Sequence, residues 1–130
     1  MKIGDVFNLT FTVSEQVYRD FTELFRDRNP LHVDDAYAAG KGFRERVMQG
    51  NILNGFISYF IGEGLPVKNV VLVSQDIAYA KPVYRGDALD FRAEIADIHD
   101  SVGIVEFKYA FSNSENARVA KGTIQVRMLP

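Results

Sequence analysis

The sequence contains no cysteine and no tryptophan, and its only histidines are His32 and His99. The lack of cysteine excludes disulfide bonds, thiol catalysis and cysteine-ligated metals, and it leaves the cellular compartment open. Two histidines are too few for a histidine-rich metal site. We therefore expect no bound metal and no other cofactor.

Neither an excess of one charge nor a long apolar run is present. The 15 basic and 17 acidic residues give a formal net charge of −2, which argues against nucleic acid as a partner. The most apolar helical stretch, residues 52–65, is shorter than the roughly 20 residues that cross a bilayer. The first residues alternate and lack the apolar core of a signal peptide. We expect a cytoplasmic protein with no membrane partner.

The chain does hold enough apolar side chains for one core. Hydrophobic residues make up 47% of the sequence, including ten phenylalanines and six tyrosines. A length of 130 residues is that of one domain. We therefore expect residues 1–130 to form a single domain.

Hydrophobic spacing predicts one strand, a helical region and then four strands. Strands are expected over residues 7–13, 70–79, 89–95, 105–111 and 119–128. Helices are expected over 15–25 (capped by Ser14 and ended by Asn29-Pro30), from Asp34 to Ala39, and over 49–62. The last helix is apolar nearly all round, so it needs a sheet wrapped around it. Tight turns between the later strands indicate antiparallel pairs. This order predicts an α+β protein, a curved antiparallel sheet around a central helix, known as the hot-dog fold.

The closest acid–histidine pair in a loop is Asp27 and His32, which flank Asn29-Pro30. A carboxylate and an imidazole that meet around one water can act as a general acid–base pair. The spacing alone also fits a structural interpretation, in which Asp27 caps a turn and His32 packs at the entry to an element.

The segment Gln49-Gly50-Asn51 opens the buried helix. Free N–H groups at a helix start, approached closely at a glycine, can form an oxyanion hole for an acyl group. Equally, Gly50 can serve packing alone. Asp76 and Asp87 are interpreted as solvated or turn positions, and His99 as a surface histidine.

Two stretches resemble a known family, the MaoC-like (R)-specific enoyl-CoA hydratases. The first consists of Asp27-Arg28-Asn29-Pro30-Leu31-His32-Val33-Asp34, Ala36-Tyr37-Ala38-Ala39, Phe43, Arg46-Val47 and Gly50. The second, residues 79–87, is similar to the family's F-x-x-P-V-x-x-G-D strand and turn.

The resemblance implies a hot-dog fold, a homodimer or dimer of dimers, and reversible hydration of a trans-2-enoyl thioester to a (3R)-hydroxyacyl thioester. It places the catalytic acid–base pair on Asp27 and His32 and the oxyanion-hole glycine on Gly50. It places a supporting serine on Ser58, and the motif residue Asn29 is expected to support the site. Coenzyme A or an acyl carrier protein enters as part of the substrate.

This chain departs from the family pattern in three places. Arg26 stands where the family commonly has glycine, and Gln49 and Asn51 replace the histidine and methionine of His-Gly-Met. The two amides predict a more polar acyl site and a polar acyl group. A hot-dog acyl thioesterase and a non-catalytic acyl-CoA-binding module are the alternatives, because a fold does not fix a function.

Overall fold

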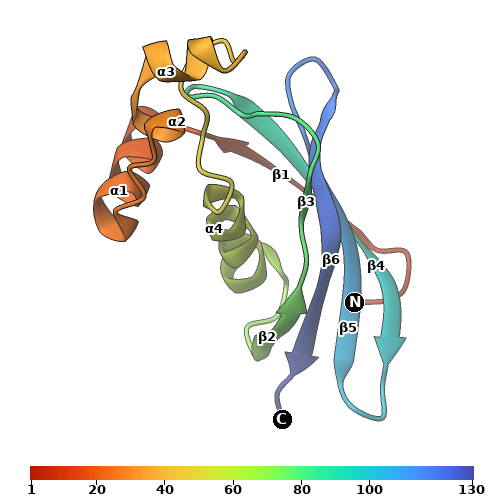
Figure 1. Ribbon diagram of the computed structural model, residues 1–130. Coiled ribbons are helices and arrows are strands. Elements are labelled where there is room, and N and C mark those ends of the chain that lie inside the picture. The colour runs from red at the N-terminus through yellow and green to blue at the C-terminus, as the bar shows by residue number, and fades with distance from the viewer.

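In the computed structural model, which describes residues 1–130, a curved antiparallel sheet wraps one side of a central helix (Figure 1). The strands are β1 (Val6–Thr12), β2 (Val70–Gln75), β3 (Ala78–Tyr79), β4 (Ala88–His99), β5 (Ile104–Ser112) and β6 (Arg118–Met128). The helices are α1 (Glu15–Phe25), α2 (Pro30–Val33), α3 (Asp35–Gly40) and α4 (Ile52–Tyr59), which continues as the π-helix η1 (Phe60–Gly64). None of them is long and apolar enough to span a membrane. The predicted α+β architecture is confirmed.

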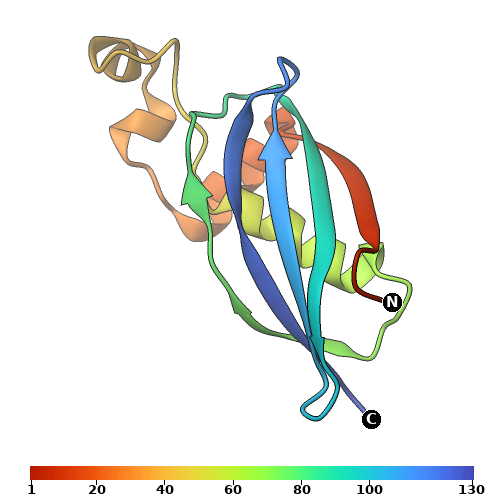
Figure 2. The same cartoon turned by 90° about the vertical axis from the view of Figure 1, so that its right-hand side faces the viewer.

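The strands lie in the order β1-β4-β5-β6-β2, and β3 pairs with β6 beyond the end of β2 (Figure 2). The hairpins β4–β5 and β5–β6 follow one another in the chain, as the tight turns predict. β1 and β2 are the two edges, because each pairs with only one neighbour. The long central strands therefore form the floor on which α4 rests.

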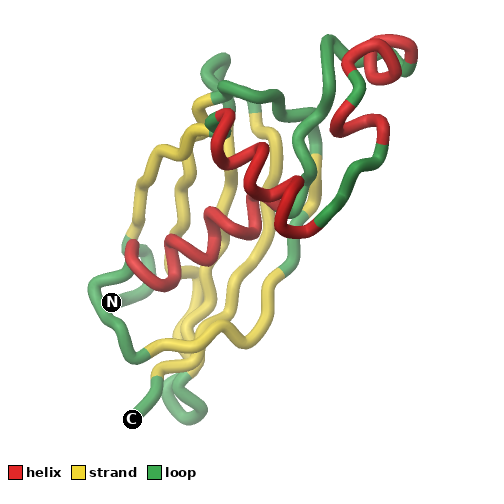
Figure 3. The backbone as a smooth tube through the Cα atoms, turned by 90° about the vertical axis from the view of Figure 1, so that its left-hand side faces the viewer, coloured by secondary structure: helices red, strands yellow, loops and turns green.

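The core lies between α4 and the concave face of the sheet. Its largest fully buried side chains include Leu53 and Phe60 above Phe91, Phe107 and Phe111 from the sheet. The opposite side of α4 carries Ser58 and Tyr59, which are exposed, so the helix is not covered all round as predicted. α1 lies on the same side of the sheet as α4 (Figure 3).

The first helix has the predicted bounds, but Asn29-Pro30 does not end it. α1 stops at Phe25 because Arg26 takes the left-handed conformation, with φ of 62°, and its N–H closes on the Thr22 carbonyl. Pro30 ends no helix and instead starts α2, where its fixed φ suits the first position. The segment between the two helices is thus a free loop that carries Asp27.

The predicted strand 70–79 is split into β2 and β3 at Asp76. The Asp76 carbonyl accepts a hydrogen bond from the Tyr109 hydroxyl at 2.7 Å, and its carboxylate accepts from the Thr123 N–H at 3.1 Å. A Cβ on Gly122 would lie 2.0 Å from the oxygen of that same carbonyl. β6 therefore needs glycine where the main chain at Asp76 approaches it. Asp76 is exposed, but it ties the break in the strand to its neighbours.

Candidate active site

The loop between α1 and α2 holds Asp27. Asn29 caps α2, with its Oδ1 accepting a hydrogen bond from the Leu31 N–H at 3.0 Å. The Asn29 main-chain N–H donates to Asp27 Oδ1 at 3.3 Å. One carboxylate oxygen is thereby tied to the loop, and the other is left for a second partner.

That second partner is His32, whose Nε2 lies 3.5 Å from Asp27 Oδ2. On the other side of the ring, His32 Nδ1 is 2.8 Å from the Val47 carbonyl. Because a carbonyl only accepts, Nδ1 carries a proton, and Nε2 is the ring nitrogen that faces the carboxylate. The His32 side chain is 17% exposed and that of Asp27 is 47% exposed. The structure thus brings the predicted pair together.

Tyr18 of α1 holds both main-chain groups that position this histidine. Its buried hydroxyl donates to the His32 carbonyl and lies 3.2 Å from the Val47 carbonyl. Burial raises the pKa of Tyr18 to about 12, although Arg46 and Arg85 act in the opposite direction. The phenol therefore stays protonated, and stays a donor, over the whole physiological range.

The amino end of α4 faces the same region. The N–H groups of Gly50 and Asn51, which precede the first residue of α4, donate to no acceptor in the protein. Both residues line a cavity of about 470 Å³ together with Asp27, Phe21 and Phe25. Unpaired N–H groups and the helix dipole favour a negatively charged oxygen at this point. Geometry of this kind suits an oxyanion hole.

A packing reason for Gly50 is present as well. A Cβ at this position would lie 2.8 Å from Cζ and 2.9 Å from Cε1 of Tyr79. The Tyr79 ring, at the end of β3, therefore occupies the space into which any side chain at Gly50 would point. The two interpretations of this glycine do not exclude each other, because the N–H and the Cβ of one residue point in different directions.

Gln49 is one of the residues that line the cavity, but its amide nitrogen is bound to the loop that holds Asp27. It is 2% exposed, and its Nε2 donates to Thr22 Oγ1 at 2.8 Å and to the Asp27 carbonyl at 3.2 Å. Its Oε1 is buried and has no partner. Gln49 thus connects α1 to the residue that carries the candidate acid.

The remaining predicted residues have separate environments. The Asn51 side chain does not cap α4, and its Oδ1 instead accepts a hydrogen bond from Asn54 Nδ2 at 2.7 Å. Ser58 lies one turn beyond Asn54 in α4 and is not among the residues that line the cavity. It makes no hydrogen bond to Asp27 or His32. The structure therefore joins Asn51 to the site and leaves Ser58 apart from the pair.

Four contributors were missed by the sequence analysis: Tyr18, Val47, Asn54 and Tyr79. Asn54 carried a signal, since it is a polar residue in an otherwise apolar helix, and Tyr79 lies in the second motif. Val47 lies in the first motif, but a sequence does not show that its main-chain carbonyl binds the histidine. His99, by contrast, is the surface histidine that was expected, 3.4 Å from Asp97.

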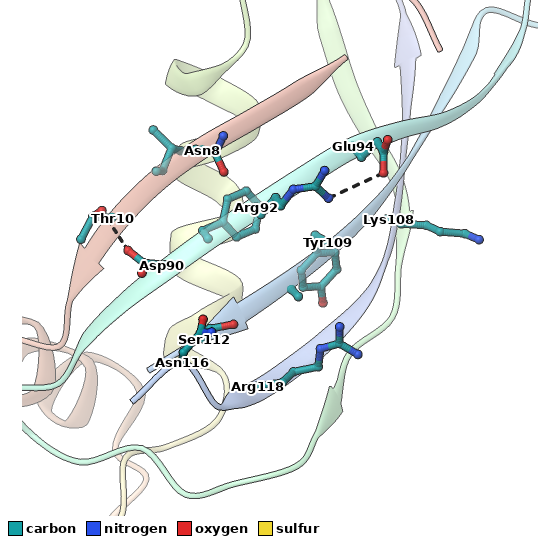
Figure 4. A pocket seen from close by; sticks show the side chains of 13 residues that line it. Asn8, Thr10, Asp90, Arg92, Glu94, Lys108, Tyr109, Ser112, Asn116 and Arg118 are labelled. Atoms are coloured by element: carbon teal, nitrogen blue, oxygen red, sulfur yellow. Dashed lines mark hydrogen bonds and ion pairs between the residues drawn. The ribbon is translucent and has the colours of Figure 1, made fainter. Parts of the chain in front are cut away.

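A larger cavity, of about 720 Å³, lies elsewhere, on the outer face of the sheet (Figure 4). Its rim is polar, and some of the rim side chains bind one another. The Thr10 hydroxyl donates to Asp90 Oδ1 at 3.3 Å, and Arg92 Nη1 lies 3.6 Å from Glu94 Oε2. Asp27, His32 and Gly50 are not among its residues. No group of three or more metal-ligating side chains is found in the structure.

Solved R-hydratases share this fold over essentially the whole chain. The R-hydratase of A. caviae superposes with a TM-score of 0.90 at 25% identity, covering 100% of this chain and 98% of that one. The unliganded R-hydratase of Pseudomonas aeruginosa gives a TM-score of 0.89 at 26% identity, covering 99% and 83%. Fold and site together define a hot-dog protein with an acid–histidine pair next to the amino end of its central helix.

The family is shown by sequence as well. The model of the MaoC-like domain matches residues 2–116. The (R)-specific enoyl-CoA hydratase of Rhodospirillum rubrum is 31% identical over 108 residues, covering 83% of this chain and 75% of that protein. A 3-hydroxybutyryl-CoA dehydratase of Methylorubrum extorquens is 35% identical over 78 residues, and the match spans half of its length. The chain belongs to the MaoC-like dehydratase family.

Proposed function

We propose that the protein is a hydro-lyase that reversibly hydrates a trans-2-enoyl thioester to a (3R)-hydroxyacyl thioester. The observation that carries the proposal is the pairing of Asp27 and His32 beside a cavity that Asp27, Gly50 and Asn51 line, the last two having main-chain N–H groups without an acceptor. The similarity to (R)-specific enoyl-CoA hydratases supports the reaction and its stereochemistry.

The chemistry follows from these positions. Water loses a proton to the Asp27–His32 pair while its oxygen bonds to the β-carbon of the substrate. The electrons of the C=C bond shift toward the thioester oxygen, and the N–H groups of Gly50 and Asn51 stabilise the enolate that forms. The pair then returns a proton to the α-carbon, which restores the carbonyl. The pair ends in the protonation state in which it began, so the reaction needs no metal or redox cofactor.

Two copies of the chain are proposed to form the working unit. β2 is an edge strand, and its residues Val71, Leu72 and Val73 are each more than 40% exposed. An unpaired apolar edge of this kind is normally covered by another strand. Sedimentation at micromolar concentration is expected to give a dimer or a dimer of dimers, and a monomeric mass would contradict this proposal.

The site of action is proposed to be the cytoplasm, where coenzyme A and acyl-carrier thioesters are made and used. The carrier is part of the substrate in this proposal. Lys81 lies in a second cavity of about 430 Å³ that shares Gly50 with the first, and its ammonium group suits the phosphates of either carrier.

The direct test is an assay with crotonyl-CoA and longer enoyl-CoAs. Loss of the conjugated-enoyl absorbance is followed in parallel with release of free thiol, for the native protein and for Asp27→Asn. Hydration predicts loss of absorbance without thiol, and it predicts that Asp27→Asn abolishes most of the activity. Release of free thiol in step with the loss of absorbance would identify a thioesterase, because hydrolysis of the thioester also removes the conjugated chromophore. That result, or the absence of both reactions, would overturn the proposal.

A further inference from the structure

Three side-chain amides form a chain from the sheet edge to the site. Gln75 of β2 donates through Nε2 to Asn54 Oδ1 at 2.6 Å, and Asn54 donates through Nδ2 to Asn51 Oδ1 at 2.7 Å. Each amide fixes the orientation of the next. At the end of the chain the Asn51 carbonyl is occupied, and the two N–H groups of its side chain are left without a partner.

Asn51 is exposed, and it lies at the cavity of the proposed site. Asn51 and Asn54 line the same 470 Å³ cavity as Asp27 and Gly50. The adjoining 430 Å³ cavity contains Gly50 and Lys81 but neither Asp27 nor Asn51. With the thioester oxygen at Gly50, the reacting carbons lie on the Asp27 side and the sulfur lies on the Lys81 side. The acyl chain beyond the β-carbon therefore extends along Asn51 and Asn54.

From this arrangement we infer that the protein selects enoyl thioesters whose acyl chain carries a hydrogen-bond-accepting oxygen beyond the β-carbon. The inference rests on the proposed function. An apolar acyl chain displaces water from the Asn51 N–H groups and offers them no acceptor, so those donors lose their hydrogen bonds when it binds. A carbonyl or carboxylate oxygen accepts from them, and the chain of amides holds them in place for it.

The experiment compares two substrates that differ at one position, hex-2-enoyl-CoA and 5-oxohex-2-enoyl-CoA. The native protein is expected to prefer the oxo compound by about tenfold in kcat/KM, the worth of one well-placed hydrogen bond. Asn51→Leu keeps the size of the side chain and removes both donors, so it is expected to abolish the preference, mainly by slowing the oxo substrate.

Two further variants sharpen the comparison. Gln75→Met does not touch the cavity but frees Asn54 and thus Asn51 to rotate, so it is expected to reduce the preference without abolishing hydration. It also serves if Asn51→Leu fails to fold. The matched control is Asn8→Leu, an exposed asparagine on the outer face of the sheet (Figure 4), which is expected to leave the preference unchanged.

The outcomes separate this inference from the proposed function. Hydration of both substrates at equal rates, or an equal loss for both in Asn51→Leu, overturns the inference and leaves the hydratase assignment standing. The second of these results would place Asn51 on the carrier arm, whose amides are common to both substrates. No hydration of either substrate would overturn the proposed function itself.

Discussion

Adding a single methyl group at Gly50 tests what that glycine is for. The Cβ of Gly50→Ala would lie 2.8 Å from Cζ of Tyr79, well inside van der Waals contact. Tyr79 is 51% exposed, so its ring can swing outward and spare the main chain. We expect a loss of about 1 kcal/mol, at the lower end of the cost of overpacking. For a chain of this length the melting temperature then falls by roughly 3–5 °C.

Turnover is expected to fall by about tenfold in the same variant, because the displaced ring disturbs the cavities on both sides of Gly50. Alanine keeps the N–H group, so the electrostatic contribution of the helix start is retained. Truncating the ring in Gly50→Ala/Tyr79→Ala gives the new methyl group the space that the ring held. Compared with Tyr79→Ala alone, this double variant is expected to have the same stability. Its turnover is expected to be lower by no more than a few-fold.

The assay is a double-mutant cycle with two readouts, thermal unfolding and kcat for hydration of crotonyl-CoA. A coupling of about 1 kcal/mol between the two positions supports the packing argument. Equal losses of stability with and without the Tyr79 ring would refute it. A double variant as inactive as Gly50→Ala would show that the methyl group obstructs the substrate itself.

Three other predictions concern the loop and its supports. Asp27→Asn and His32→Ala are each expected to lower turnover by about 10²–10⁴ with little change in melting temperature. The double variant is expected to lose little more, and a well-folded Asp27→Asn with full activity would falsify the assignment. Arg26→Gly removes the steric cost of a non-glycine residue in the left-handed conformation (φ of 62°). Its free energy of unfolding, measured in urea, is expected to rise by about 0.5–1 kcal/mol with turnover unchanged. A destabilised variant would contradict this. The pKa of Tyr18 rises from 10.0 to about 12 on folding, so its contribution to stability is complete below pH 10 and is lost between pH 10 and 12. Tyr18→Phe is therefore expected to flatten the stability curve over that range, although burial of Tyr79 and Tyr109 raises their pKa as well. An unchanged slope in alkaline unfolding curves would contradict the placement of Tyr18.

Features decided by near neighbours in the chain were predicted well. Ser14 caps α1 by accepting from the Val17 N–H at 3.1 Å, and Asp34 caps α3 by accepting from the Tyr37 N–H at 3.1 Å. The alternation of apolar residues located β4, β5 and β6, because period-two burial is local to one strand. Asp87 closes its turn on the Tyr84 N–H at 2.9 Å, as a turn residue does.

Features decided by distant residues were not predicted. The break at Asp76 depends on Gly122, and the orientation of His32 depends on the Val47 carbonyl. The hydrogen bond from Gln49 to Thr22 spans 27 positions in the chain. Hydrophobic spacing and secondary-structure propensity describe one segment at a time. They therefore do not identify which distant residue will be the partner in a hydrogen bond. The proximity of Asp27 and His32 was accessible because a single loop carries both.

The two short helices α2 and α3 pack mainly against each other and project beyond the end of α4 (Figure 1). Their links to the rest of the chain include the Tyr18 hydroxyl and the ion pair of Arg46 with Asp35, whose Nε and Oδ1 lie 3.1 Å apart. Such a segment opens at a lower free energy than the sheet and its aromatic core. Because His32 belongs to it, we expect mild denaturant to inactivate the protein before the global fold is lost. The main-chain amides of these two helices are expected to exchange with solvent sooner than those of β4 and β5.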